Sequence, residues 1–245
     1  MKNYVLAFFL ALSSASVIAQ QNDLNIFHIT SSHTSFPDTA RANGHLYDNV
    51  LYDVQSHYTD SSVLIIVPKN IDVKKKVNLV FWFHGWRNNI DSAVISYHLA
   101  SQFEASKLNA VLILAETAKN SPDSYGGKLE NKGTFTALVQ DVFKKLQVEK
   151  ICKKCKPGNI LLAGHSGAYR VIAYILQNGN LPVKETILFD ALYSETDKFL
   201  NWIKANSNHR FIDIYTDSGG TNGETKGFMN LLSKVAGGHQ EKVLL

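Results

Sequence analysis

Short apolar runs alternate with longer amphipathic segments along most of the chain. The runs are rich in valine, isoleucine, leucine and phenylalanine, which is typical of strands buried on both faces of a parallel sheet. They predict strands at residues 62–68, 77–83, 110–115, 159–163, 185–190 and 211–216. Apolar residues three and four positions apart predict helices at 91–106, 133–147, 169–176, 196–205 and 224–235. Because such an alternation requires right-handed crossovers, we expect an α/β fold with three α/β/α layers around a mainly parallel sheet. The polar stretch 20–59 is expected to add one or two outer strands.

The apolar run 159–163 ends at a glycine and continues through a serine into a helical pattern. A serine at so tight a strand-to-helix turn has strained backbone angles, and only small residues fit two positions before and after it. Gly164 and Ala168 meet this requirement. The helix that follows would direct its dipole and the N–H of Gly167 towards the hydroxyl of Ser166. We interpret Ser166 as an activated nucleophile; the alternative is a serine that caps an ordinary helix.

Residues 164–168 (Gly-His-Ser-Gly-Ala) resemble the nucleophile elbow Gly-x-Ser-x-Gly of the α/β-hydrolase superfamily of serine esterases and lipases, here an exported, bacterial-type member, with Ala168 in place of the last glycine. The resemblance covers most of the chain after the first 19 residues. It implies an oxyanion loop after the strand 77–83, where a His-Gly pair is followed by Trp86. In that arrangement the N–H groups of Trp86 and Gly167 face the same developing negative charge.

A serine hydroxyl needs an imidazole base, and a carboxylate must orient that base. The resemblance implies that both follow Ser166, with the acid first. Asp190 ends an apolar run, whereas Asp217 holds the commoner superfamily position but lies in a glycine-rich turn. We favour Asp190, although either aspartate can be structural. His209 begins a strand, at the opposite edge of the sheet from Ser166, which leaves His239 as the candidate base.

The usual superfamily base follows an eighth strand, but the predicted helix 224–235 leaves no room for one before His239. One interpretation is therefore a hydrolase fold without its last strand and helix. Either His239 reaches the site from a shortened end, or the chain is a fragment or a degenerate copy without the base.

The loops after the strands supply the candidate pocket. The loop 116–128 is long and rich in polar residues and glycine, and such loops line the ligand crevice in open α/β sheets. We interpret His84 as a buried histidine bonded to the loop backbone rather than as a catalytic group. Arg87, with the two asparagines after it, would contact substrate or cap the next helix. The candidate pocket residues are His84, Arg87, Tyr125, Tyr169 and Tyr193, and Trp82 and Trp86 are further candidate walls.

Composition indicates one globular domain and an exported chain. Of 245 residues, 45% are hydrophobic and 19% charged, which suits a sizeable core. Residues 1–19 have the three parts of a secretory signal, with Lys2, a short apolar stretch and small residues up to Ala19. The stretch is shorter than the roughly 20 residues of a membrane anchor. We therefore expect cleavage near Ala19, a hydrolase domain at 20–245, and a secreted or periplasmic location.

The remaining features exclude several classes of partner. The positive charge of the chain is small: removal of Lys2 with the signal lowers the net charge from +4 to +3. Because nucleic-acid binding usually requires a larger positive excess, we predict none. Cys152 and Cys155 are the only cysteines. In an exported chain we expect a disulfide between them rather than a redox motif or half a zinc site. We predict a monomer without metal, cofactor or stable membrane insertion.

The predicted function is hydrolysis of an ester, from a small molecule or a polymer, through an acyl-enzyme on Ser166, with an amide or peptide as the second choice. The alternative is a non-catalytic or truncated hydrolase-fold binding protein, because a fold does not guarantee its activity. The distance between His239 and Ser166 would distinguish the two.

Overall fold

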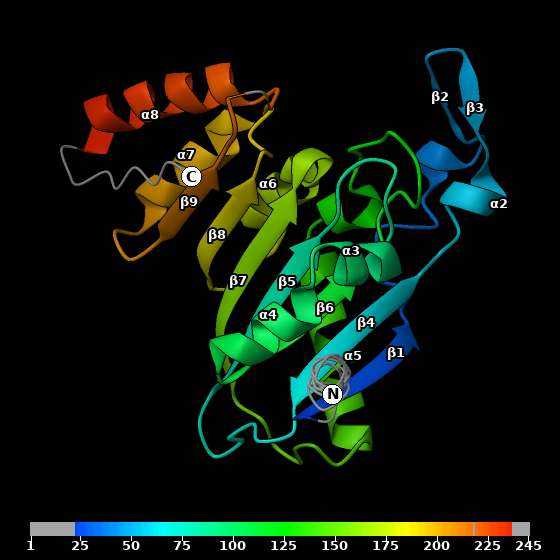
Figure 1. Cartoon of the computed structure of the whole chain (residues 1–245), viewed down its shortest axis with the longest axis vertical. Helices are drawn as coiled ribbons and strands as arrows, with labels where there is room; N and C mark the ends of the chain where they lie inside the picture. The colour runs from blue at the N-terminus through cyan, green and yellow to red at the C-terminus, as the bar shows by residue number, and fades with distance from the viewer. Residues whose placement is uncertain (1–22, 218, 237–245) are drawn as a thin grey trace, which may run out of the picture.

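A computed structural model describes residues 23–217 and 219–236. In this part of the chain the main sheet has seven strands in the order β1-β4-β6-β5-β7-β8-β9 (Figure 1). Pairing is antiparallel between β1, β4 and β6 and parallel from β6 to β9. The expected mainly parallel α/β sheet is confirmed. The strands are β1 (Leu24–Thr30), β4 (Ser62–Pro68), β5 (Val77–Phe83), β6 (Ala110–Ala115), β7 (Pro157–His165), β8 (Val183–Phe189) and β9 (Arg210–Ile214).

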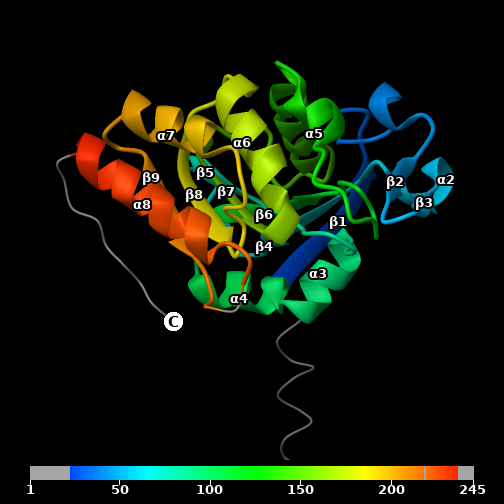
Figure 2. The ribbon, with the colours of Figure 1, turned by 90° about the horizontal axis from the view of Figure 1, so that it is seen from above.

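Helices cover both faces of the sheet, as Figure 2 shows. On one face the side chains of α3 and α4 pack in an apolar cluster with Leu112 and Leu114 of β6. On the other face α5, α6 and α7 enclose a larger cluster around Phe81 and Phe83 of β5. The strand β6 is buried along its whole length, which explains its uninterrupted apolar sequence. The helices are α3 (Ile90–Ser96), α4 (Leu99–Ser106), α5 (Thr134–Val148), α6 (Tyr169–Asn178), α7 (Thr196–Ala205) and α8 (Asn222–Ala236).

The expectation of a single helix at residues 91–106 is wrong. The chain forms α3 and α4, separated by Tyr97 and by His98, whose φ of 50° is left-handed. The amide of Gln102 donates to the backbone oxygen of Tyr97 at 2.7 Å and fixes the break. Apolar spacing continues across the break, so periodicity alone did not reveal it. The break leaves the ring of Tyr97 beside that of His165, with centroids 5.4 Å apart.

The stretch before β4 contains one strand of the main sheet and a separate hairpin. β1 pairs with β4, while β2 (His45–Tyr47) pairs with β3 (Val50–Tyr52). Asp48 and Asn49 connect them with φ of 50° and 59°, as in a type I′ turn. The hairpin projects from the body of the molecule at the upper right of Figure 1. The short helix α2 (Val54–His57) leads from it to β4. The expected outer strands are thus present.

The end of the described chain also follows the expectation. The predicted helix 224–235 is α8, and β9 is the edge strand of the sheet in the described residues. The expected disulfide between Cys152 and Cys155 is present between α5 and β7. None of the described helices has the length and apolarity that a membrane span requires. The predicted signal at 1–19 and the candidate base His239 lie outside the described residues.

Candidate active site

Ser166 lies at the turn between β7 and α6, at the carboxyl edge of the sheet. Its φ is 53°, a left-handed conformation that a non-glycine residue seldom adopts. The turn is tight: a Cβ added to Gly164 would stand 2.6 Å from Cβ of Ala168 and 2.9 Å from Cδ1 of Ile172. Small residues are therefore required on both sides of the serine. The predicted strand, tight turn and helix are confirmed.

The loop after β5 packs directly on this turn. A Cβ on Gly85 would stand 2.8 Å from Cβ of Ser166 and 2.8 Å from the carbonyl oxygen of His165. A Cβ on Gly167 would stand 2.4 Å from Cδ1 of Trp86, whose indole therefore lies against the backbone of Gly167. The structure thus brings the two residues expected to form the oxyanion hole into contact beside Ser166.

His84 is buried and bonded within its own loop, as expected. Its Nδ1 donates to the carbonyl oxygen of Gly85 at 2.7 Å, and its Nε2 lies 2.5 Å from Oε1 of Glu116. The second oxygen of Glu116 accepts from the N–H of Ile90 at 3.2 Å. These bonds hold the loop that carries Gly85 and join it to the end of β6. Glu116 is not among the predicted site residues, although a charged residue directly after the buried run of β6 is a signal that could have found it.

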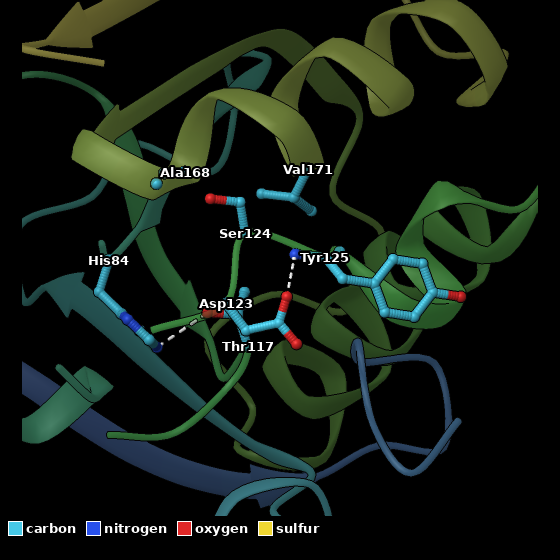
Figure 3. Close-up of a pocket in the computed structure, with 9 residues that line it drawn as sticks. His84, Thr117, Asp123, Ser124, Tyr125, Ala168 and Val171 are labelled. Carbon is cyan, nitrogen blue, oxygen red and sulfur yellow. Dashed lines mark hydrogen bonds between the residues drawn. The ribbon is translucent and has the colours of Figure 1, made fainter. Parts of the chain in front are cut away.

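A small cavity lies beside the serine turn, and Figure 3 shows several of its lining residues. The loop 116–128 forms one side of it, as expected, and the start of the elbow helix forms the other. Ser124 joins the loop 116–128 to the loop after β5, because its Oγ accepts from Nε1 of Trp86 at 2.7 Å. The lining residues are His84, Thr117, Asp123, Ser124, Tyr125, Gly126, Gly167, Ala168 and Val171.

A partly buried ion pair anchors this loop. Arg41 donates to both carboxylate oxygens of Asp123, at 2.6 and 3.1 Å, and Tyr58 donates to the same group at 3.2 Å. Burial raises the pKa of Tyr58 to about 12. Nothing in the local sequence pairs Arg41 with Asp123, because they are 82 residues apart. Their contact keeps the neighbouring Ser124 in place beside Trp86.

The candidate pocket residue Tyr125 lies between two guanidinium groups. Arg41 and Arg170 stand 4.7 and 5.3 Å from its ring centroid. Its hydroxyl donates to Asp38 at 3.1 Å, and burial, together with Asp38, raises its pKa to about 12. Each of the two cations is also paired with a carboxylate, Arg41 with Asp123 and Arg170 with Glu130.

The other candidate pocket residues are more scattered. Arg87 is exposed, with a φ of 54°, and its N–H donates to the carbonyl oxygen of Ser121 at 3.0 Å. The helix after it is capped by Asn89, which accepts from the N–H of Ser92 at 2.9 Å. The rings of Tyr169 and Tyr193 lie 6.0 Å apart, and Tyr193 is 39% exposed. Trp82 is in the core. None of these four candidates is among the residues that line the cavity.

Asp190 is fixed by hydrogen bonds at the end of β8. Its carboxylate accepts from N–H and Oγ1 of Thr216 at 3.0 and 2.8 Å, and from Oγ1 of Thr221 at 3.0 Å. Partial burial raises its pKa, but these bonds and the nearby His165 outweigh burial, and the pKa of Asp190 falls below its usual value. Among the described residues, Asp217 accepts from Asn222 alone, at 3.1 Å, five positions further along the chain. Of the two candidate acids, Asp190 is thus the one held directly after a strand of the sheet, by hydrogen bonds from two threonines.

Neither His209 nor His165 bonds the hydroxyl of Ser166 in the described chain. His209 donates to the carbonyl oxygen of Trp202 at 2.6 Å and stacks on its ring at 4.3 Å, which is a structural arrangement. His165 is half-buried, with Nδ1 3.3 Å from the hydroxyl of Tyr97. Burial lowers the pKa of His165, and Asp190 opposes the decrease. Within residues 23–217 and 219–236 no side chain bonds the hydroxyl of Ser166, and the expected base, His239, lies beyond this part.

Strand order, layers and the serine turn together define an α/β-hydrolase fold. A scan against protein-family models and a search of curated proteins found no match. Among solved structures, the chain is similar to FphF, a fluorophosphonate-binding serine hydrolase of Staphylococcus aureus, with 11% identity, a TM-score of 0.54 and 90% of each chain covered. It is also similar to the feruloyl esterase module of Clostridium thermocellum, with 10% identity, a TM-score of 0.54, and 87% of this chain and 74% of that chain covered. A third similar structure is S-formylglutathione hydrolase of Staphylococcus aureus, with 11% identity, a TM-score of 0.51, and 90% of this chain and 88% of that chain covered. At these identities the likeness shows the fold.

Proposed function

We propose that the chain is a serine hydrolase that cleaves an ester through an acyl-enzyme on Ser166. The observation that carries the proposal is the left-handed Ser166 with Gly85 packed against its side chain. A backbone strained at one residue and enclosed by a second loop is typical of a functional site. The three solved structures named above are hydrolases and esterases by their names, which supports the same reaction class.

In the proposed reaction Oγ of Ser166 attacks the ester carbonyl carbon and gives its proton to the imidazole of His239. The carbonyl π electrons move to the oxygen, and the N–H groups of Trp86 and Gly167 bind the oxyanion. The tetrahedral intermediate then expels the alcohol, which takes the proton from the imidazolium. Water repeats the sequence on the acyl-enzyme and releases the acid and free Ser166. Asp190 is the proposed carboxylate that orients His239.

Two observations favour the alternative, a non-catalytic binding protein. In the described chain the hydroxyl of Ser166 has no imidazole partner, and a helix rather than a strand follows β9. A protein that kept the cavity without a base would bind an ester and leave it intact. The two functions therefore differ in one property, the nucleophilicity of Ser166.

We also propose that the chain is exported. The signal-like residues 1–19 support this location, and so does the disulfide between Cys152 and Cys155, since such bonds persist in oxidising compartments. N-terminal sequencing of the protein released by an expressing cell would give a mature end near Gln20. An uncleaved N-terminus would contradict the proposal.

The test of the function is covalent labelling of the purified mature chain with a fluorophosphonate probe. We expect labelling of the wild type and none of Ser166→Ala. Ser233→Ala is the matched control, because it removes an exposed hydroxyl of α8 and leaves the serine turn and the loop of Trp86 unchanged. Failure of the folded wild type to react would reject the hydrolase function and favour the binding protein.

A further inference from the structure

Trp86 is the exposed tryptophan of this chain. Trp86 is 42% exposed, whereas Trp82 and Trp202 are 9% and 8% exposed. Nevertheless its indole has a fixed position, because Nε1 donates to Ser124 at 2.7 Å and Cδ1 lies against the backbone of Gly167. An apolar ring held in place beside the serine turn and left open to solvent is available to a ligand at that turn.

The β2–β3 hairpin extends the surface of this ring. The ring of Tyr47 meets Trp86 edge to face, with centroids 5.2 Å apart and planes at 74°. Val50 pairs with Tyr47 across the hairpin, so both side chains lie on the same face. Val50 is 54% exposed. Tyr47, Val50 and Trp86 thus form a continuous apolar wall that begins at Gly167, and we call these three residues the aromatic wall.

The opposite face of the same hairpin provides an internal comparison. Leu46 and Leu51 pair with each other and are 66% and 61% exposed. They alternate with the residues of the aromatic wall and therefore point away from it. Apolar exposure is thus present on both faces, and the face with Tyr47 is the one whose ring packs on Trp86 of the oxyanion loop.

We propose that the aromatic wall binds an aromatic ring of the ester that Ser166 cleaves. The proposal rests on the proposed function and adds the substrate class. An aromatic ring suits the wall because rings attract one another edge to face or offset, an interaction that a saturated ring of the same size lacks. The aromatic wall begins at Gly167, the residue that follows Ser166. A ring bound to the wall therefore lies close enough to be part of the ester that Ser166 attacks. The ring can lie on the acyl or on the alcohol side of that ester.

The experiment compares matched esters on the folded Ser166→Ala chain by calorimetry, in which no turnover occurs. Methyl benzoate is compared with methyl cyclohexanecarboxylate for a ring on the acyl side, and phenyl acetate with cyclohexyl acetate for a ring on the alcohol side. In one of the two pairs we expect the aromatic ester to bind about 5- to 10-fold more tightly than its saturated partner. The pair with this preference identifies the side of the ester that carries the ring.

Variants assign the preference to the wall. We expect Trp86→Leu and Tyr47→Leu to abolish it, whereas Tyr47→Phe retains it because the ring remains. Both leucine variants leave the backbone N–H groups in place, and Tyr47→Leu carries the test if Trp86→Leu does not fold. The matched control is the double variant Leu46→Ser and Leu51→Ser, on the other face of the hairpin, which should keep the preference.

Three results would overturn the proposal: equal affinity within both pairs, no binding of any of the four esters, or a preference that survives both leucine variants. Fluorophosphonate labelling of the wild type separates this failure from failure of the proposed function. A labelled chain without aromatic preference remains a hydrolase with another substrate. An unlabelled chain that prefers aromatic esters keeps the aromatic wall and loses the hydrolase function.

Discussion

Gly85 and Ser166 are in direct contact: a Cβ on Gly85 would stand 2.8 Å from Cβ of the serine. Real Cβ atoms essentially never approach so closely, so even a methyl group at this position must displace the serine or the loop. The added Cβ would also stand 2.8 Å from the carbonyl oxygen of His165, so a methyl group here meets backbone as well as side chain. The backbone of one loop therefore determines where the candidate nucleophile stands.

The first prediction follows from this contact. Gly85→Ala should slow fluorophosphonate labelling of Ser166 about 100-fold, because a displacement of about 1 Å in reacting groups has that effect. The rate of labelling at fixed probe concentration measures it. Gly223→Ala is the matched control, since a Cβ at Gly223 meets nothing within 4 Å. An unchanged rate in Gly85→Ala would mean that the loop yields to a methyl group and does not position the serine.

The second prediction distinguishes the two candidate acids. Because the hydrogen bonds of Thr216 and Thr221 fix Asp190 at the end of β8, we expect Asp190→Asn to lower kcat about 10⁴-fold on an ester that the wild type cleaves. Asp217→Asn should change kcat by no more than about threefold, because in the described part of the chain Asp217 bonds only the nearby Asn222. The reverse pattern would assign the acid to Asp217.

A change in folding must be separated from this loss. Asp190 also joins β8 to the segment between β9 and α8, so removal of its charge weakens three hydrogen bonds. Thr221→Val removes one of them and keeps the carboxylate. We expect this variant to lower the melting temperature while retaining most of kcat, which would show that Asp190→Asn acts through the charge.

Local pattern was sufficient for most of the fold and for the centre of the site. The strands β4 and β5 run between the predicted residues, because burial on both faces leaves an uninterrupted apolar sequence between polar ends. Ser166 could be identified because its turn admits only small neighbours, a constraint that is visible within five residues. These features depend on interactions that are local in sequence.

The surroundings of the serine could not be predicted in this way. The Arg41–Asp123 pair spans 82 residues, and the contact between Tyr47 and Trp86 joins a separate hairpin to the oxyanion loop. Neither has a periodicity or a motif. The break at His98 depends on one left-handed residue inside an apolar spacing that continues through it. Such features arise from tertiary packing, which a single sequence does not display.

The third prediction concerns the base. His239→Ala should abolish fluorophosphonate labelling, because a serine without its imidazole is a weak nucleophile. His209→Ala is the matched control: it loses the bond to the carbonyl oxygen of Trp202 and the ring stacking, so we expect a lower melting temperature and normal labelling. If His239→Ala labels normally, His165→Phe is the next variant, since His165 precedes the serine and its charge interacts with Asp190.

The last prediction concerns Asp213, a carboxyl group enclosed between β9 and α8. Oδ2 accepts from Oγ1 of the buried Thr225 at 2.6 Å, while Oδ1 is buried with no partner among the described residues. Burial, with a smaller contribution from Asp190, raises the pKa of Asp213 to about 6. Between the ordinary value of 3.8 and about 6, the folded chain binds more protons here than the unfolded chain.

The contribution of Asp213 to the free energy of unfolding therefore decreases as pH rises through this window, by at most about 3 kcal/mol at pH 7. Asp213→Asn removes the buried charge and should be more stable than the wild type at pH 7 by about 1–2 kcal/mol, with the difference shrinking towards pH 4. Urea unfolding at pH 4, 5, 6 and 7 measures this difference in stability.

Thr225→Val, which removes the hydrogen bond from Thr225 to the carboxylate, should act in the opposite direction and destabilise most at pH 7. A difference between Asp213→Asn and the wild type that does not vary with pH would mean that this carboxyl group keeps its ordinary pKa, and that α8 is attached to the sheet mainly by apolar contacts such as that of Phe228 with Phe211.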